Sequence, residues 1–278
     1  MSDQYSELIA EWNAIQEIVS KSVVYSDSFD SFSLPTPAQP MPPNSSSTTV
    51  LHTLPTQTGT SPTGSDSKPI VSLIAGADIS FDTSDSSRGV AAIVVLQYPS
   101  FNQVYCKTRD FTLNIPYISG YLAFREKDVI VEMMRELQDE HPELYPQVLF
   151  IDGNGLLHPR RSGCACHVGV ELDIPTIGVG KTFLAFPELH WNTAQYRDAL
   201  VQKGDWVPLI DTTGFVCGAS VKTAPNIKNP IFISVGHRFQ LESAVQFVVD
   251  CCKFRQPEPI RAADHAGREF VRLHPLPH

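Results

Sequence analysis

Apolar runs divide the chain beyond residue 69 into short strands and amphipathic helices. Buried strands are near-continuous runs of β-branched and aromatic residues, whereas helices repeat their apolar positions about every 3.6 residues. Strands are predicted at Ile70–Ile79, Arg88–Gln97, Val104–Leu113, Val148–Ile151, Pro175–Val179, Trp206–Ile210, Val216–Ser220 and Ile231–Val235. Helices are predicted from Glu126 to Leu137 and at Cys164–Leu172, Trp191–Lys203, Leu241–Val249 and Ala262–Leu273. Three successive strands, followed by strands that alternate with helices, predict an α/β fold with a mixed central sheet flanked by helices.

The N-terminal part of the chain has a different pattern. Apolar residues between Ser6 and Val24 recur at helical spacing, which predicts an amphipathic helix. We expect this helix to pack on the flank of the globular domain, and a partner-binding helix is the alternative. Residues 34–68 are rich in Ser, Thr and Pro, which predicts a disordered linker. The chain therefore divides into an N-terminal helix and tail (1–33), a linker (34–68) and a globular domain (69–278).

Composition narrows the setting in which the protein acts. The net charge is −9 over 278 residues, but residues 1–68 hold 7 acids and 2 bases, so the domain itself carries only −4. A local basic groove is compatible with that value. The six cysteines include close neighbours such as Cys251 and Cys252, which favours a reducing compartment over a disulfide framework. No apolar run is long enough for a membrane span. We expect a soluble monomer in the cytoplasm, with the nucleus or nucleolus as the alternative.

The stretch from Val148 to Lys181 carries the clearest chemical signal. Asp152 ends one buried strand, and Lys181 follows the next strand after an intervening helix. Ligands of open α/β sheets bind at the carboxyl ends of the strands. The sequence therefore predicts an acid and a base on one edge of the sheet.

Two further acids, Asp78 and Glu126, are candidates to join Asp152. Converging carboxylates repel one another unless a cation lies among them, and hard oxygen ligands favour Mg²⁺ or Mn²⁺. Such a site suits the attack of water on a phosphodiester, with Lys181 holding a phosphate oxygen. Glu126 has an alternative reading as a helix-start acid. His237 follows a strand and is either a proton carrier or a solvated turn histidine.

Two motifs mimic other sites. Gly180-Lys181-Thr182 resembles the end of a phosphate-binding loop, but Pro175 stands where its first glycine would be. The Cys164-x-Cys166-His167 sequence has no second ligand pair at zinc-site spacing, which favours cysteines packed in a helix.

Five motifs occur in an order that resembles the Endonuclease V family. They are AGADIS at Ala75–Ser80, PYISGYLAFRE at Pro116–Glu126, DGNG at Asp152–Gly155, GVGK at Gly178–Lys181 and SVGHR at Ser234–Arg238. The resemblance runs from about Ile70 to Arg261. Within it, the stretch Cys251–Arg261 is more similar to animal members than to bacterial ones.

The resemblance implies a ribonuclease H-like fold and Mg²⁺-dependent cleavage of the second phosphodiester 3′ to inosine, with Mn²⁺ able to substitute. It assigns metal-binding roles to Asp78, Glu126 and Asp152, a late active-site role to His237 and a phosphate contact to Lys181. The loop of Pro116, Tyr117, Ile118 and Ser119 is implied to separate bases, with Tyr117 stacking. Candidates for the base pocket are Gly120, Leu122, Gly153, Gly155 and Gly178.

The expected partner is inosine-containing single-stranded RNA, because splayed RNA bases are accessible. Repair of deaminated, inosine-containing DNA is the alternative, since an extruded base costs least in single strands or at mispairs. A third reading, from a different class, is a non-catalytic module that binds inosine-containing RNA.

Overall fold

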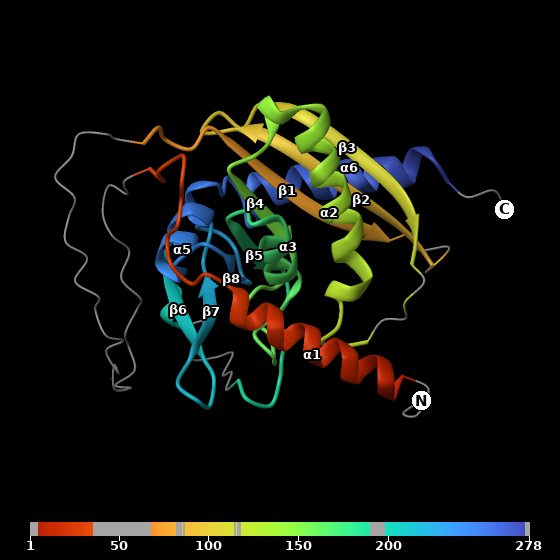
Figure 1. Cartoon of the computed structure of the whole chain (residues 1–278). Coiled ribbons are helices and arrows are strands. Elements are labelled where there is room, and N and C mark those ends of the chain that lie inside the picture. Colours follow the sequence, from red (N-terminus) through yellow and green to blue (C-terminus); the bar gives the residue numbers. More distant parts are fainter. Residues whose placement is uncertain are drawn as a thin grey trace.

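A single eight-stranded sheet forms the centre of the computed structural model, which describes residues 5–35, 68–81, 85, 87–113, 115, 118–189 and 198–275. The strands lie in the order β3-β2-β1-β4-β5-β8-β7-β6 (Figure 1). They span β1 Leu73–Phe81, β2 Arg88–Gln97, β3 Gln103–Thr112, β4 Val148–Asp152, β5 Thr176–Gly180, β6 Trp206–Ile210, β7 Val216–Val221 and β8 Ile231–His237. The pairs β1–β4 and β4–β5 are parallel and the others antiparallel, which confirms the predicted mixed sheet.

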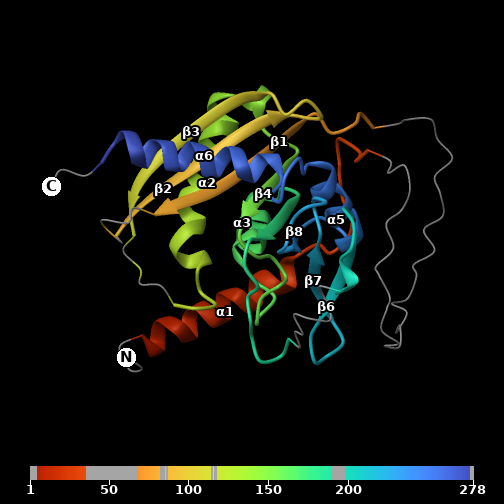
Figure 2. The same ribbon diagram turned by 180° about the vertical axis from the view of Figure 1, so that it is seen from behind.

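Helices cover both faces of this sheet. They are α1 Ser6–Ser22, α2 Ala123–Glu140, α3 Cys164–Leu172, α5 Leu241–Asp250 and α6 Glu258–Leu273, with a short 3₁₀ helix at Pro142–Leu144. In Figure 1 the helix α2 lies in front of strands β1 to β3, and Figure 2 shows α6 across the opposite face. The alternation of side chains along β4 explains the two layers. Val148 and Phe150 pack in a core with α5 and α6, whereas Leu149 and Ile151 pack with α2 and α3.

Helix α1 packs on the flank of the domain, as expected for its apolar stripe. Trp12 is 5% exposed and stacks on Phe124 of α2 with ring centroids 4.7 Å apart. Tyr121 completes this small cluster, which α1 forms below the first turn of α2 (Figure 1). The predicted linker falls almost entirely within residues 36–67, outside the described residues.

Several element boundaries differ from the prediction, among them those of α2, which begins at Ala123 rather than Glu126, and of β1, which begins at Leu73 rather than Ile70. Helix α6 begins at Glu258 rather than Ala262, because proline is tolerated in the first turn of a helix and Pro259 occupies it. Strand β8 continues through His237, which is buried rather than placed in a turn. Most of the helix predicted at Trp191–Lys203 lies outside the described residues, and its described end leaves the helical conformation at Leu200.

All six cysteines are free thiols, in line with the sequence. Within the described residues, no helix combines the length and the apolar character that a membrane crossing requires.

Buried His167 should make the fold sensitive to acid. It is 2% exposed in α3, and burial lowers its pKa from 6.5 to about 4. The unfolded chain therefore binds more protons than the folded one between these values, so stability present above pH 6.5 is lost as the pH falls. We expect wild type to lose about 3 kcal/mol more than His167→Gln between pH 7 and pH 4, measured by urea unfolding. Equal losses would mean that His167 is not neutral in the folded protein.

Candidate active site

The register of two parallel strands places Asp78 beside Asp152. Ala77 of β1 pairs with Ile151 of β4, so the next residues in register are the two acids. Side chains alternate between the two faces along a strand, so both acids point to the same face as Phe150. That is the face that α5 and α6 cover. Asp78 is 5% exposed. Two carboxyl groups thus share one partly buried edge of the sheet.

Lys181 provides the positive charge for this pair. It follows β5, the next parallel strand, and its Nζ lies 2.5 Å from Asp152 Oδ2 and 3.6 Å from Asp78 Oδ1. The same Nζ lies 3.2 Å from Oδ1 of Asp264, which comes from α6. Asp264 is also paired with Arg268 one helical turn later, at 3.0 Å. The sequence therefore predicted the acid–lysine edge correctly but missed a third acid on it.

A close helix–strand contact brings Asp264 to the site. A Cβ atom added at Gly76 of β1 would lie 2.0 Å from the carbonyl oxygen of Pro259, so only glycine allows α6 to approach the strand this closely. One sign of this contact was visible in the sequence, because a glycine inside a predicted strand often marks a place where another backbone approaches closely.

The electrostatics of the cluster reflect the crowding of like charges. Burial, together with the neighbouring Asp152 carboxyl group, raises the pKa of Asp78 to about 8. Burial would lower the pKa of Lys181, but the surrounding carboxylates outweigh it and raise that pKa above its ordinary value. The lysine is therefore held in its charged form.

Glu126 lies in the other layer, on helix α2. It lies in the first turn of α2 and is 6% exposed. Burial raises its pKa to about 8, and the charge of Asp152 adds to this rise while Arg125 opposes it. Within the described part of the chain, no three His, Cys, Asp or Glu side chains are grouped closely enough to hold a metal ion. The meeting of Asp78, Glu126 and Asp152 at one cation stays a prediction.

The chemistry of the donors fits a hard divalent cation. Asp78 and Asp152 both lie around one positive group, the ammonium of Lys181, and both offer carboxylate oxygens. Their mutual repulsion, and the raised pKa values of Asp78 and Glu126, are what a bound cation would relieve. These carboxylates would be the ligands, and Asp264 is placed to join them.

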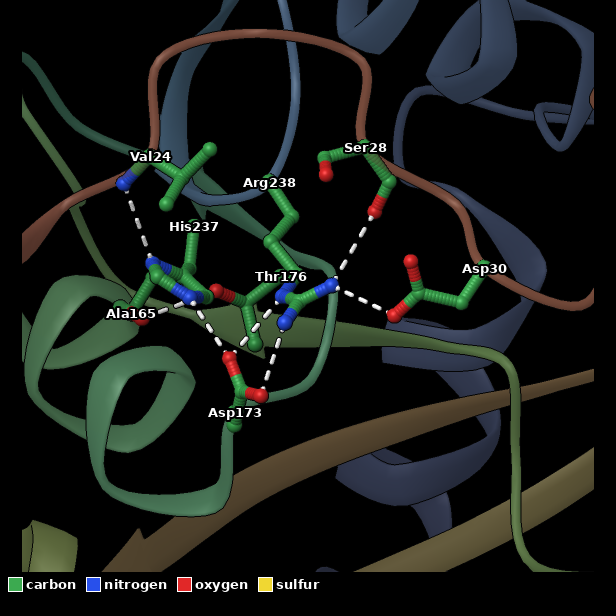
Figure 3. A network of polar contacts seen from close by, with 8 residues as sticks. All are labelled: Val24, Ser28, Asp30, Ala165, Asp173, Thr176, His237 and Arg238. Carbon is green, nitrogen blue, oxygen red and sulfur yellow. Dashed lines mark hydrogen bonds and ion pairs between the residues drawn. The ribbon is translucent and has the colours of Figure 1, made fainter.

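His237 lies at the opposite ends of the strands from Lys181, so its predicted place beside Asp152 is wrong. Strand β8 runs antiparallel to β5, and His237 pairs with Thr176 at the start of β5, about 16 Å of strand away from Lys181. Its Nδ1 accepts a hydrogen bond from the Val24 backbone N–H at 3.2 Å, and its Nε2 contacts Asp173 at 3.2 Å (Figure 3). His237 therefore fastens the segment that follows α1.

The residues predicted to form the base pocket lie in different surroundings. At Gly155 and Gly178 the backbone packs so closely that an added Cβ would lie 2.0 Å from the Val235 carbonyl oxygen and 2.5 Å from the Gly155 nitrogen, respectively, and their place in a base pocket stays a prediction. Their space is filled by the chain's own backbone. Gly153 follows Asp152 directly, and Leu122 is the residue that precedes α2.

The predicted substrate loop is only partly described. Pro116 and Tyr117 lie outside the described residues, whereas Ile118 and Ser119 lead directly into the turn at Gly120. Ile118 packs against the cluster that contains Trp12.

The fold and the site together define a ribonuclease H-like domain with an acid–lysine cluster at the ends of its parallel strands. A family model for Endonuclease V matches residues 57–265. The chain belongs to the Endonuclease V family.

Individual relatives agree with this placement. The chain is 45% identical over 202 residues to Endonuclease V of Mus musculus, covering 72% of this chain and 60% of the mouse protein. It is 43% identical over 202 residues to the Homo sapiens protein, covering 72% of this chain and 71% of that one.

Two solved structures are similar over nearly the whole chain. The catalytic domain of human Endonuclease V has a TM-score of 0.78 at 35% identity, covering 96% of this chain and 97% of that one. Ciona intestinalis Endonuclease V has a TM-score of 0.79 at 32% identity, covering 98% and 99%. The Ciona structure is that of a single-substitution variant in complex with a 23mer DNA that contains an inosine followed by a ribo-adenosine.

Proposed function

We propose that this protein is a divalent-metal-dependent endonuclease that cleaves the second phosphodiester 3′ to inosine in single-stranded RNA. The cluster of Asp78, Asp152 and Lys181 carries the proposal. Acids and a cation at the ends of parallel strands are suited to binding a metal and a phosphate together. Mg²⁺ is the preferred ion, with Mn²⁺ able to replace it, because every candidate ligand is a carboxylate oxygen.

Each residue of the cluster has a distinct task. The metal, held by Asp78, Asp152 and Glu126, would activate water and neutralise charge on the phosphate. Lys181 is held charged by its carboxylate neighbours and lies at the edge, 31% exposed, where its ammonium can contact a phosphate oxygen. Asp152 contacts Lys181 directly and so sets the position of that ammonium.

Recognition of inosine requires the base to leave its stack. The loop of residues 116–119 is proposed to separate the neighbouring bases, with Tyr117 stacking in the vacated space. Ribose is favoured over deoxyribose by the similarity to animal members. In the related Ciona complex, a ribonucleotide follows the inosine.

A pair of matched oligonucleotides tests the substrate. One carries ribose and the other deoxyribose on the nucleotide 3′ to inosine, and each is compared with an adenosine control. We expect faster cleavage of the ribose version in Mg²⁺, with none after chelation, measured by gel analysis of end-labelled products. Faster cleavage of the deoxyribose version would favour DNA repair instead. Binding of the RNA without any cleavage would leave only a binding module.

A further inference from the structure

Three side chains converge on one backbone carbonyl beside the proposed substrate loop. The carbonyl oxygen of Gly120 accepts hydrogen bonds from Gln16 Nε2 at 3.0 Å, Arg160 Nη2 at 2.7 Å and His158 Nε2 at 3.0 Å. The backbone N–H of Arg160 donates to His158 Nδ1 at 3.2 Å, so Nε2 of the neutral ring carries the hydrogen given to Gly120. The turn after Ser119 is therefore fixed from outside the loop.

Gln16 stands out in this group because it comes from α1, far away in the sequence. Its side chain is fully buried and uses both ends of its amide. Nε2 donates to Gly120 and, at 3.4 Å, to the carbonyl of Ser162, while Oε1 accepts from Arg160 Nε. A buried amide with partners on two segments resists displacement, because each lost partner leaves a desolvated polar group. One side chain thus joins the loop before α2 to the loop that follows Asp152.

Helix α1 is itself held in place at its middle and just beyond its C-terminal end. Trp12 stacks on Phe124, and the hydroxyl of Tyr121 donates to Asn13 Oδ1 at 2.8 Å. Beyond the helix, the backbone N–H of Arg238 donates to the Val24 carbonyl at 2.7 Å, next to the His237 contact (Figure 3).

The guanidinium of Arg238 extends this second attachment. It binds Asp173 at 2.7 Å and Asp30 at 2.9 Å, so the segment after α1 is tied to the end of α3. Residues 5–30 are therefore fastened to the domain, although they lie outside the residues 57–265 that the family model matches.

We propose that Gln16 is a positioning residue that fixes residues 118–121, and with them the substrate-separating loop, relative to the loop after Asp152. The proposal rests on the proposed function, because it takes residues 116–119 to be the substrate-contacting loop. Gln16 touches no reacting atom. It acts through the carbonyl of Gly120, and its loss should weaken engagement of the substrate more than the chemical step.

Two substitutions separate positioning from packing. Gln16→Met keeps the length of the side chain but removes all its hydrogen bonds. Gln16→Glu keeps the length of the side chain and an acceptor for Arg160 but removes the amide donor to Gly120. Glu17→Gln is the matched control, since the neighbouring Glu17 is exposed and pairs only with Lys21 in the described contacts.

Two measurements on the full chain test the proposal. Hydrogen exchange at residues 118–121 should quicken in both Gln16 variants but not in the control. With the inosine-containing RNA as substrate, KM should rise roughly tenfold, as expected for about 1.4 kcal/mol of lost positioning, while kcat changes by less than about twofold. Melting temperatures are measured for both variants, and a KM raised at a temperature at which the variant is fully folded would support positioning over packing.

Failure of the proposed role of Gln16 can be distinguished from failure of the proposed nuclease function. Unchanged exchange in Gln16→Met would overturn the fixing of the loop, whether or not the protein cleaves RNA. Quickened exchange with an unchanged KM would overturn its role in substrate engagement. A wild-type protein that cleaves no inosine-containing strand would overturn the proposed function itself, while the exchange result would still decide whether Gln16 holds the loop.

Discussion

Replacing Asp152 by asparagine is expected to lower cleavage by on the order of 10³-fold or more while leaving RNA binding nearly intact. Asp152 is the acid that contacts Lys181 at 2.5 Å and whose charge raises the pKa of both Asp78 and Glu126. It therefore lies at the centre of the proposed metal site. Asparagine keeps the shape but removes the charge that a divalent cation needs. Binding is expected to be spared because the proposed substrate loop and Lys181 are both retained.

Single-turnover cleavage and a binding titration with the same inosine-containing RNA separate the two effects. Asp128→Asn is a suitable control, because Asp128 lies on α2 near Glu126 but its side chain is 71% exposed and pairs with Lys127. The control should cleave at the wild-type rate. Parallel loss of binding and cleavage in Asp152→Asn would contradict a role confined to the reaction and would point to a structural one.

The pairing of Asp78 with Asp152 could be predicted because it depends on local rules. Each acid lies at or near the end of a run that reads as a buried strand, and parallel strands bring their carboxyl ends to the same edge. Lys181 followed from the same rule, since β5 is parallel to β4. The sequence also showed the apolar stripe that packs α1 on the domain.

What could not be predicted depends on strand direction and on helix placement. His237 ends a strand as Asp152 does, but β8 is antiparallel to β5, so its end lies at the opposite edge of the sheet. Direction is set by the connections between strands, and an apolar run carries no sign of it. Asp264 was missed because its helix, whose start was predicted four residues too late, reaches the site only through the close contact at Gly76. That contact joins segments far apart in the sequence.

Gln16 was missed for another reason. A polar residue within an amphipathic helix normally faces solvent. Its burial becomes visible only when the partners at Gly120 and Ser162, more than 100 positions away, are known.

Replacing Lys181 by methionine is expected to destabilise the metal-free protein by about 2 kcal/mol, less than the loss of a fully buried ion-pair partner because the lysine is partly exposed. The ammonium lies within 3.6 Å of Asp78, Asp152 and Asp264. Its removal leaves three neighbouring carboxyl groups without their shared counter-charge. A divalent cation can supply that charge, so Mg²⁺ should raise the melting temperature of Lys181→Met more than that of wild type.

Mg²⁺ should not restore cleavage by Lys181→Met as it restores stability. Saturating Mg²⁺ restores the balance of charge among the acids but gives no substitute for an ammonium on the phosphate, so the variant should remain roughly 10²-fold slower than wild type. Lys127→Met is the matched control, because Lys127 also pairs with two carboxylates, Asp128 and Glu171, and none of its described ion pairs involves Asp78, Asp152 or Asp264. Melting curves and cleavage rates, each with and without Mg²⁺, give the comparison. If Mg²⁺ stabilised Lys181→Met no more than it stabilises wild type and Lys127→Met, the acids around Lys181 would not be a metal site.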